Sequence, residues 1–423
     1  MNQKQPAISV AELDLGGPAP TLRPAPGAEQ PVPGDVYALV RVDGRPAATV
    51  LGRYEPGEDP AEVLAALAAK RLTDTGPGTA AERLAAAERT PAPSRTPPAS
   101  VVVATRERPA SLARALDSLL AQDHPDHELI VVDNAPRTSA THDLVTERYA
   151  GRVRYVREDR PGLATAHNAG VAAARGEILA FTDDDVIADP RWLSALAAPF
   201  AADPGLGCVT GLILPARLTT PAQILLESHG GFAKGFAPRL YDPARPPADE
   251  PLFPFTAGSF GSGANMAFRA SALRRAGGFD PATGTGTPAK GGDDLYAFVA
   301  VLAAGHRLRY TPDALVWHHH RETWQDLRNQ AYGYGAGLTA YLTATLVRRP
   351  ALLPALLARV PRGLAHARAM TAERGGGDQQ GHAPGQHGTH SHPWPASLSR
   401  LERRGMLYGP LGYLKARMNG AFR

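Results

Sequence analysis

The chain has 423 residues, of which 43% are hydrophobic and 20% are charged, and its net charge is +4. This length allows two or three domains, and the composition excludes a wholly disordered chain. Because the 45 basic and 41 acidic residues are interleaved, no nucleic-acid partner is expected, and the single cysteine, Cys208, excludes an internal disulfide.

Glycine and proline are in excess, with 43 and 40 residues, and their clusters divide the first part of the chain. Residues 1–34 are rich in Pro and Ala without periodicity, so we expect a disordered leader. A small module at 35–89 should contain a β-hairpin that turns at Asp43-Gly44, followed by a helix. A proline-rich linker is expected at 90–98. For this module, packing on the next domain, acceptor recognition and partner docking all remain open.

Strands and helices alternate from residue 99 onward, which predicts an α/β domain with a mostly parallel sheet flanked by helices. Strands are expected at 100–104, 128–133, 153–156 and 177–182, and helices at 109–121 and 163–174. We expect this domain to span residues 99–320. A helical C-terminal region should follow at 321–423, with a low-complexity Gly, Gln and His segment at about 374–393.

Three adjacent carboxylates, Asp183, Asp184 and Asp185, follow one of the predicted strands. They would repel one another unless a cation neutralised them, and oxygen ligands of this kind suit Mg²⁺ or Mn²⁺. A solvated acidic turn before the next helix is the alternative.

Two more features could carry chemistry farther along the chain. Asp293 and Asp294 open a helix behind Gly291-Gly292, where N-capping is the simpler interpretation. His318 ends the predicted strand at 314–317 and is either a metal ligand or part of an exposed turn of three histidines.

Taken together and in order, eight short motifs over about residues 98–335 resemble family 2 glycosyltransferases. The motifs are SVVVATRERP from Ser100, IVVDN from Ile130, RPGLATAHNAG from Arg160, FTDDD from Phe181, GANMAFR from Gly263, GGFD from Gly277, GDD from Gly292 and VWH from Val316. The resemblance implies a GT-A fold, a nucleoside-diphosphate sugar donor, a divalent cation (Mg²⁺ or Mn²⁺) and inversion at the anomeric carbon. The acceptor would be a glycan, a lipid-linked molecule or a small molecule.

The resemblance also implies roles for individual residues. The donor nucleotide would contact Thr105, Asp133, Asn168 and Asp183; the metal would bind Asp185 and His318; Asp294 would be the general base; and Gly263, Asn265 and Asp293 are candidates for the acceptor site or its lid. Position 167 is His where the family often has Arg or Lys, so a diphosphate contact there would depend on pH. A helix N-terminus at Asp294 is expected to lower the pKa of that carboxyl.

The expected function is therefore metal-dependent, inverting transfer of a sugar to an acceptor hydroxyl by single displacement. A non-catalytic module that binds a sugar nucleotide or glycan is the alternative. No apolar signal core opens the sequence and no uncharged apolar run reaches about 18 residues, so a cytoplasmic protein is expected. Basic residues interleaved with Leu, Tyr and Met between 348 and 417 leave two interpretations open: peripheral contact with the inner face of the membrane, or a solvated helical face.

Overall fold

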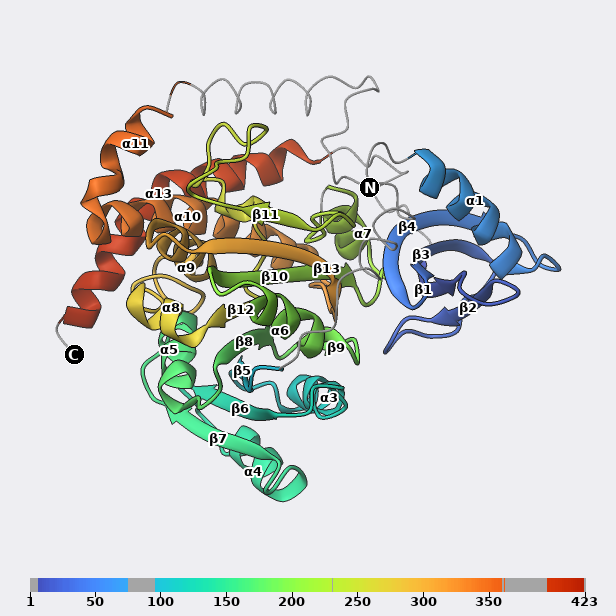
Figure 1. The fold of residues 1–423 in the computed structure, drawn as a ribbon, viewed down its shortest axis with the longest axis horizontal. Helices are drawn as coiled ribbons and strands as arrows, with labels where there is room; N and C mark the ends of the chain where they lie inside the picture. Colours follow the sequence, from blue (N-terminus) through green and yellow to red (C-terminus); the bar gives the residue numbers. More distant parts are fainter. Residues whose placement is uncertain (1–6, 75–95, 230, 360, 362–393, 422–423) are drawn as a thin grey trace.

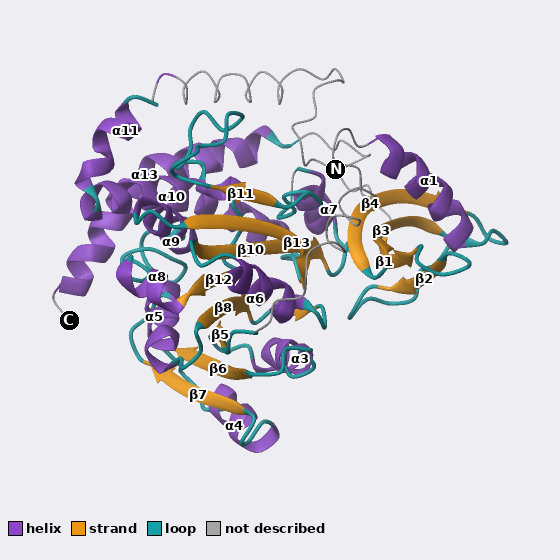
Figure 2. Cartoon of the chain, in the orientation of Figure 1, coloured by secondary structure: helices purple, strands orange, loops and turns teal. Residues whose placement is uncertain are grey.

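The computed structural model describes residues 7–74, 96–229, 231–359, 361 and 394–421 (Figure 1). Most of the expected linker at 90–98 and all of the low-complexity segment at 374–393 lie outside these residues. The described chain forms a four-stranded sheet near the N-terminus and a nine-stranded central sheet, with helices on both sides of the central sheet (Figure 2). In this part of the chain, no helix combines the length and the apolar character needed to span a membrane.

The N-terminal sheet has the strand order β2-β1-β3-β4 and is covered by one helix. Its elements are β1 (Ser9–Asp14), β2 (Thr21–Pro24), β3 (Gly34–Val42), β4 (Arg45–Tyr54) and α1 (Pro60–Asp74). The predicted hairpin and helix are confirmed, and both turn residues, Asp43 and Gly44, have positive φ. In contrast, the expectation of a disordered leader at 1–34 is wrong for β1 and β2. β1 is held by parallel pairing with β3, a non-local contact that the composition of the segment does not reveal.

The central sheet has the order β11-β13-β10-β12-β8-β5-β6-β7, with β9 paired to β13. Its strands are β5 (Ala99–Thr105), β6 (His127–Asn134), β7 (Val153–Glu158), β8 (Ile178–Asp183), β9 (Val186–Ala188), β10 (Leu206–Pro215), β11 (Arg239–Tyr241), β12 (Asn265–Arg269) and β13 (Arg307–His318). The pairings make β5, β6, β7, β8, β10 and β13 run in one direction, whereas β9, β11 and β12 run against them. The expected mostly parallel sheet is thereby confirmed.

A helical layer covers each face of this sheet. Successive strand residues point to opposite faces, so neighbouring residues of one strand pack against different helices. Val101 and Val103 face α3 (Pro109–Leu119), α4 (Ala140–Arg148) and α6 (Trp192–Ala202). Val102 faces α5 (Leu163–Ala173), α8 (Ala270–Arg275) and α9 (Asp293–Ala303), and the same core extends to α10 (Trp324–Arg348) and α13 (Ala396–Ala421). Among the described residues, the remaining helical segments are α7 (Pro221–Ser228), α11 (Leu353–Leu357) and two short 3₁₀ turns at Ala257–Ser259 and Pro350–Leu352. The expected helical C-terminal region is confirmed.

The N-terminal sheet packs against the ends of β10 and β13. Tyr37 and Leu39 of β3 share an apolar core with Leu214 and Trp317. Beside this core, the buried Arg41 guanidinium donates to Glu12 Oε1 at 2.7 Å and to Asp189 Oδ2 at 2.6 Å. Of the three roles left open for the module, packing on the next domain is therefore the one that these contacts support.

Candidate active site

The polar residues that end the parallel strands meet at one edge of the central sheet. Thr105 of β5 lies opposite Asp133 of β6, and Ala104 lies opposite Asp183 of β8. In open α/β sheets, the carboxyl ends of the strands form the ligand crevice. The sheet register thus gathers Thr105, Asp133 and Asp183 at the position where a ligand is expected.

The acidic turn is brought to His318 by a short strand that sequence patterns did not predict. After Asp185 the chain forms β9, which pairs antiparallel with the end of β13, so that Val186 lies opposite His318. His318 Nε2 is 3.3 Å from Asp185 Oδ1. One potential ligand atom from each of Asp183, Asp185 and His318 lies within 4.8 Å of the others, so this group could hold a metal ion. Two carboxylate oxygens and one imidazole nitrogen suit a divalent cation.

Two arginines that the sequence analysis did not assign flank the acidic turn. Arg108 donates to Asp184 Oδ1 at 3.0 Å and to Asp185 Oδ2 at 3.1 Å, and Arg321 Nη2 lies 3.5 Å from the same Asp185 oxygen. Thr105, for which a donor contact is expected from the sequence, donates its hydroxyl to Asp184 Oδ2 at 2.6 Å. Asp185 therefore turns one oxygen toward the arginines and the other toward His318.

Burial and these neighbouring charges shift the pKa values of Asp183 and Asp185 in opposite directions. Desolvation, reinforced by the charge of Asp185, raises the pKa of Asp183 to about 7. Burial also opposes ionisation of Asp185, but the hydrogen bond with His318 and the charges of His318, Arg321 and Arg108 outweigh it and lower the pKa of Asp185. Asp185 is thus the more acidic of the two carboxyls.

A chain of hydrogen bonds runs from His318 to the N-terminal sheet. His318 Nδ1 lies 3.0 Å from Nδ1 of His320, whose Nε2 lies 3.2 Å from Glu227 Oε2 on α7. Tyr37 of β3 donates its hydroxyl to the other oxygen, Glu227 Oε1, at 3.2 Å. Phe232 packs against both imidazole rings. No motif points to this connection, because Tyr37, Glu227 and His318 are far apart in the sequence.

The hydrogen-bond partners of His318 and His320 assign the tautomer of each ring. Glu227 accepts a hydrogen bond, so His320 carries its proton on Nε2. Burial lowers the pKa of His320, which leaves the ring neutral with a lone pair on Nδ1. His318 must then donate from Nδ1. Burial opposes the charged form of His318, but the hydrogen bond and the charge of Asp185 outweigh it and raise the pKa of His318, so without a metal the ring also directs an N–H from Nε2 at Asp185. When the ring loses that proton, the Nε2 lone pair points at the carboxylates. That is the orientation a metal ligand requires.

Asp294 lies at the start of α9, next to the Gly-rich segment before β12. Its Oδ2 accepts from the Gly263 N–H at 2.8 Å, and its Oδ1 accepts from the Leu295 N–H at 2.8 Å. Contrary to the sequence expectation, the pKa of Asp294 is raised, to about 6: desolvation and the adjacent Asp293 outweigh the two N–H donors. Asp293 is buried, with Oδ2 at 3.3 Å from His167 Nδ1.

His167 is buried between Phe181 and Phe279. Its charge, when present, favours ionisation of both Asp183 and Asp294. The ring therefore lies between the acidic turn and the start of α9, and it links the two groups of carboxylates.

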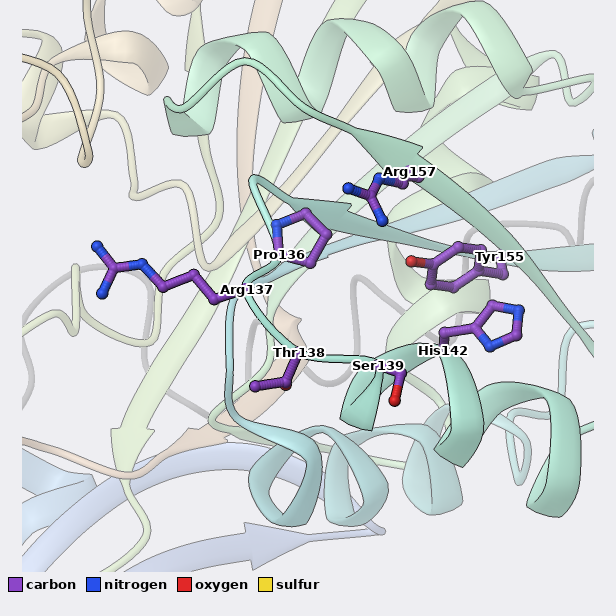
Figure 3. A pocket seen from close by; sticks show the side chains of 7 residues that line it. All are labelled: Pro136, Arg137, Thr138, Ser139, His142, Tyr155 and Arg157. Carbon is purple, nitrogen blue, oxygen red and sulfur yellow. The ribbon is translucent and has the colours of Figure 1, made fainter.

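A surface pocket of about 390 Å³ lies at the ends of β6 and β7 (Figure 3), and one of its lining residues, Tyr155, contacts Asp133. The pocket is lined by Pro136, Arg137, Thr138, Ser139, His142, Tyr155 and Arg157. Tyr155 donates to Asp133 Oδ2 at 2.9 Å, while Asp133 Oδ1 is buried and has no hydrogen-bond partner within the described residues. A buried acceptor of this kind is available to a ligand that brings a donor.

Two other predicted site residues make internal contacts. The amide of Asn168 donates to Phe279 O at 2.8 Å and accepts from Phe279 N at 3.0 Å. Asn265 is fully buried, donates to the carbonyls of Leu212 and Ala314 and accepts from Trp192 Nε1. These bonds give Asn168 and Asn265 a structural role within the protein. The nucleotide and acceptor roles expected from the sequence stay predictions.

The family model described as Glycosyl transferase family 2 matches residues 100–276. These residues belong to glycosyltransferase family 2. The family 2 segment includes Thr105, Asp133 and the acidic turn, and it ends before Asp294 and His318. Together with the mixed sheet flanked by helices, the match confirms the expected GT-A type of α/β fold.

Several glycosyltransferases resemble parts of the chain. An uncharacterised glycosyltransferase of Nostoc is 32% identical over 111 residues, which are 26% of this chain and 34% of the relative. The pre-mycofactocin glycosyltransferase of Mycobacterium tuberculosis is 28% identical over 240 residues, covering 56% of this chain and 46% of the relative. A mannosyltransferase structure from Pyrobaculum calidifontis, in complex with GDP-Man and Mn²⁺, has a TM-score of 0.43 and 20% identity, covering 84% of this chain and 93% of that one. The chain spans less than half the length of these two curated relatives.

Proposed function

We propose that this chain is a metal-dependent, inverting glycosyltransferase that moves a sugar from a nucleoside-diphosphate donor to an acceptor hydroxyl. The observation that carries the proposal is the desolvated carboxylate of Asp294, oriented by the Gly263 and Leu295 N–H groups. Its pKa of about 6 suits a base that is ionised at neutral pH yet still basic enough to accept a proton.

In this proposal Asp294 takes the proton of the acceptor hydroxyl while the hydroxyl oxygen attacks the anomeric carbon. The bond to the donor diphosphate breaks on the opposite face, so one displacement inverts the configuration and needs no covalent nucleophile. Asp293 and His167 line the same region, where they would hold Asp294 in a fixed electrostatic environment.

Asp183, Asp185 and His318 are the residues that would hold the divalent cation. When bound, the cation would stabilise the negative charge of the departing diphosphate. The imidazole among its ligands favours Mn²⁺ over Mg²⁺. Arg108 and Arg321 add fixed positive charge beside Asp185.

The donor nucleotide would lie at the ends of β5 and β6. The free Asp133 Oδ1 would accept a hydrogen bond from the base or ribose, and Arg137 and Arg157 line the adjoining pocket. A neutral nucleobase does not need two positive charges beside it. Phosphate or carbonyl oxygens of the donor are therefore the groups expected near Arg137 and Arg157. The acceptor would be a glycan, a lipid-linked molecule or a small molecule, and the site of action would be the cytoplasm.

The test combines a thermal-shift screen of UDP-, GDP- and dTDP-sugars with an assay of donor consumption, both with Mn²⁺ and both applied to the wild type and to Asp294→Asn. We expect the same donor to raise the melting temperature of both proteins, and only the wild type to consume that donor. Donor binding without any turnover by the wild type, across a broad acceptor panel, would favour the non-catalytic binding module instead. Equal turnover by Asp294→Asn would refute the base assignment.

A further inference from the structure

The outer face of α13 carries a stripe of exposed apolar side chains. The stripe consists of Leu407, Leu411, Leu414 and Met418, which are 84%, 50%, 48% and 58% exposed. Their spacing of four, three and four residues places them within an arc of about 60° on the helix and along about 16 Å of its length. Large apolar side chains that are exposed in a continuous line mark an interaction surface.

The opposite face of α13 fixes the direction in which the stripe points. A Cβ at Gly405 would collide with the Tyr332 carbonyl of α10, and one at Gly409 would collide with Thr339 and the Ala336 carbonyl. These glycines let the two helices approach closely, and Tyr413 and Ala416 are buried on the same side. Figure 1 shows α13 at the edge of the molecule beside α10. The helix therefore cannot rotate to bury its stripe without losing this contact.

Exposed basic residues border the stripe on both sides. At about 100° per residue, Arg403 and Arg417 fall on one side of it, and Arg404 and Lys415 fall on the other. Glu402 is the single acidic residue in the sequence of α13. An apolar line between two basic borders matches an anionic lipid surface, where acyl chains lie below negatively charged headgroups.

A second copy of this chain is a poorer partner for the surface. Pairing two copies of α13 through their stripes would bring the same basic borders together, and like charges at close range oppose association. The stripe also lies on a convex helix instead of in a groove, which suits a flat bilayer.

We propose that α13 docks on an anionic membrane surface, with the stripe inserted at the level of the headgroups and Arg403, Arg404, Lys415 and Arg417 against the lipid charges. This inference is independent of the proposed function, because none of these residues belongs to the candidate active site. It gives the basic C-terminal region a role in placing the enzyme at a membrane.

The test measures co-sedimentation of the full chain with vesicles of phosphatidylcholine, with and without phosphatidylglycerol. The wild type should bind the anionic vesicles, and high salt should weaken this binding. Leu407→Ser/Leu411→Ser/Leu414→Ser should lower it by about tenfold or more, and Arg403→Gln/Arg404→Gln by a similar factor. The matched control is Leu240→Ser, which removes a leucine that is 44% exposed on β11 and should bind like the wild type.

Thermal melts of each variant separate a lost surface from a lost fold, because substitutions at exposed positions should leave the melting temperature unchanged. Failure of the wild type to bind anionic vesicles, or equal binding by the Leu triple variant, would overturn the proposal. A dimer in light scattering that dissociates in the triple variant would identify a second copy as the occupant and would also overturn it.

Discussion

The Nδ1 atoms of His318 and His320 face each other at 3.0 Å, and this pair connects the N-terminal sheet to the acidic turn. Glu227 holds the proton of His320 on Nε2, and Tyr37 holds Glu227. Through these bonds, Tyr37 of β3 influences which ring nitrogen of His318 carries a proton. The N-terminal sheet is thus coupled to the candidate metal site by direct contacts.

Glu227→Gln should weaken Mn²⁺ binding by about 10–100-fold, the usual effect of losing a partner behind a metal-bound histidine. The new amide can donate to His320 Nε2, which would move the His320 proton to Nδ1 and force the His318 proton onto Nε2. Electron paramagnetic resonance of free Mn²⁺ measures this affinity without any donor. Glu128→Gln, at the far end of β6, is the control and should bind Mn²⁺ like the wild type. Unchanged affinity in Glu227→Gln would show that the hydrogen bonds do not set the tautomer.

The rate of transfer should depend on pH through Asp294. The base acts when ionised and its pKa is about 6, so kcat/KM should be low below this pH, rise through it and level off above it. Asp293→Asn removes one of the two main causes of the raised pKa, and should move this acidic limb to lower pH. Asp143→Asn, an exposed substitution on α4, should leave the profile in place. A limb that does not move in Asp293→Asn would contradict the electrostatic coupling of the two carboxyls.

Arg41→Met should destabilise the folded chain by about 3–5 kcal/mol, because it leaves Glu12 and Asp189 buried without their shared cation. Urea unfolding measures the loss. Arg53→Met removes an exposed partner of Asp35 in the same sheet and should change the free energy of unfolding little. If the two variants were equally stable, the buried bridge would not hold the module to the central domain.

Asn265→Ala should lower stability by about 2–4 kcal/mol, since it deprives two carbonyls and the Trp192 N–H of their partner. At temperatures well below unfolding, the KM for the acceptor should not change. Asn329→Ala, which alters an exposed amide on α10, serves as the control for stability. A raised acceptor KM with an unaltered free energy of unfolding would instead support the acceptor role that the sequence suggested.

The elements of the central sheet could be predicted because their signals are local. The apolar runs that end at Thr105, Asp133 and Asp183 can each be recognised as a strand from their own residues. Parallel pairing of these strands brings their polar ends together. β1 could not be predicted because it is held by parallel pairing with β3, more than twenty residues away. The surrounding prolines are typical of a disordered leader.

Sequence patterns indicated candidate site residues, but not their acidity or their contacts. Asp294 lies at the start of a helix as predicted, but its pKa is raised where the helix terminus was expected to lower it, because burial is a property of the folded chain. Asn168 and Asn265 stand in the motifs, yet their amides bond to the protein itself. Arg321 and the Glu227–His320 contact had no signal, because they depend on segments that meet only after folding.

Inverting transfer with Asp294 as the base is tested most directly by the anomeric configuration of the first sugar released from an α-linked nucleotide sugar. Proton NMR can follow transfer, or slow hydrolysis, of the donor identified by thermal shift, with Mn²⁺ present and before the product equilibrates. We expect the β-configured product from the wild type and no product from Asp294→Asn, although the variant still binds the donor. An α-configured product, or the same rate in Asp294→Asn, would contradict single displacement with Asp294 as the base.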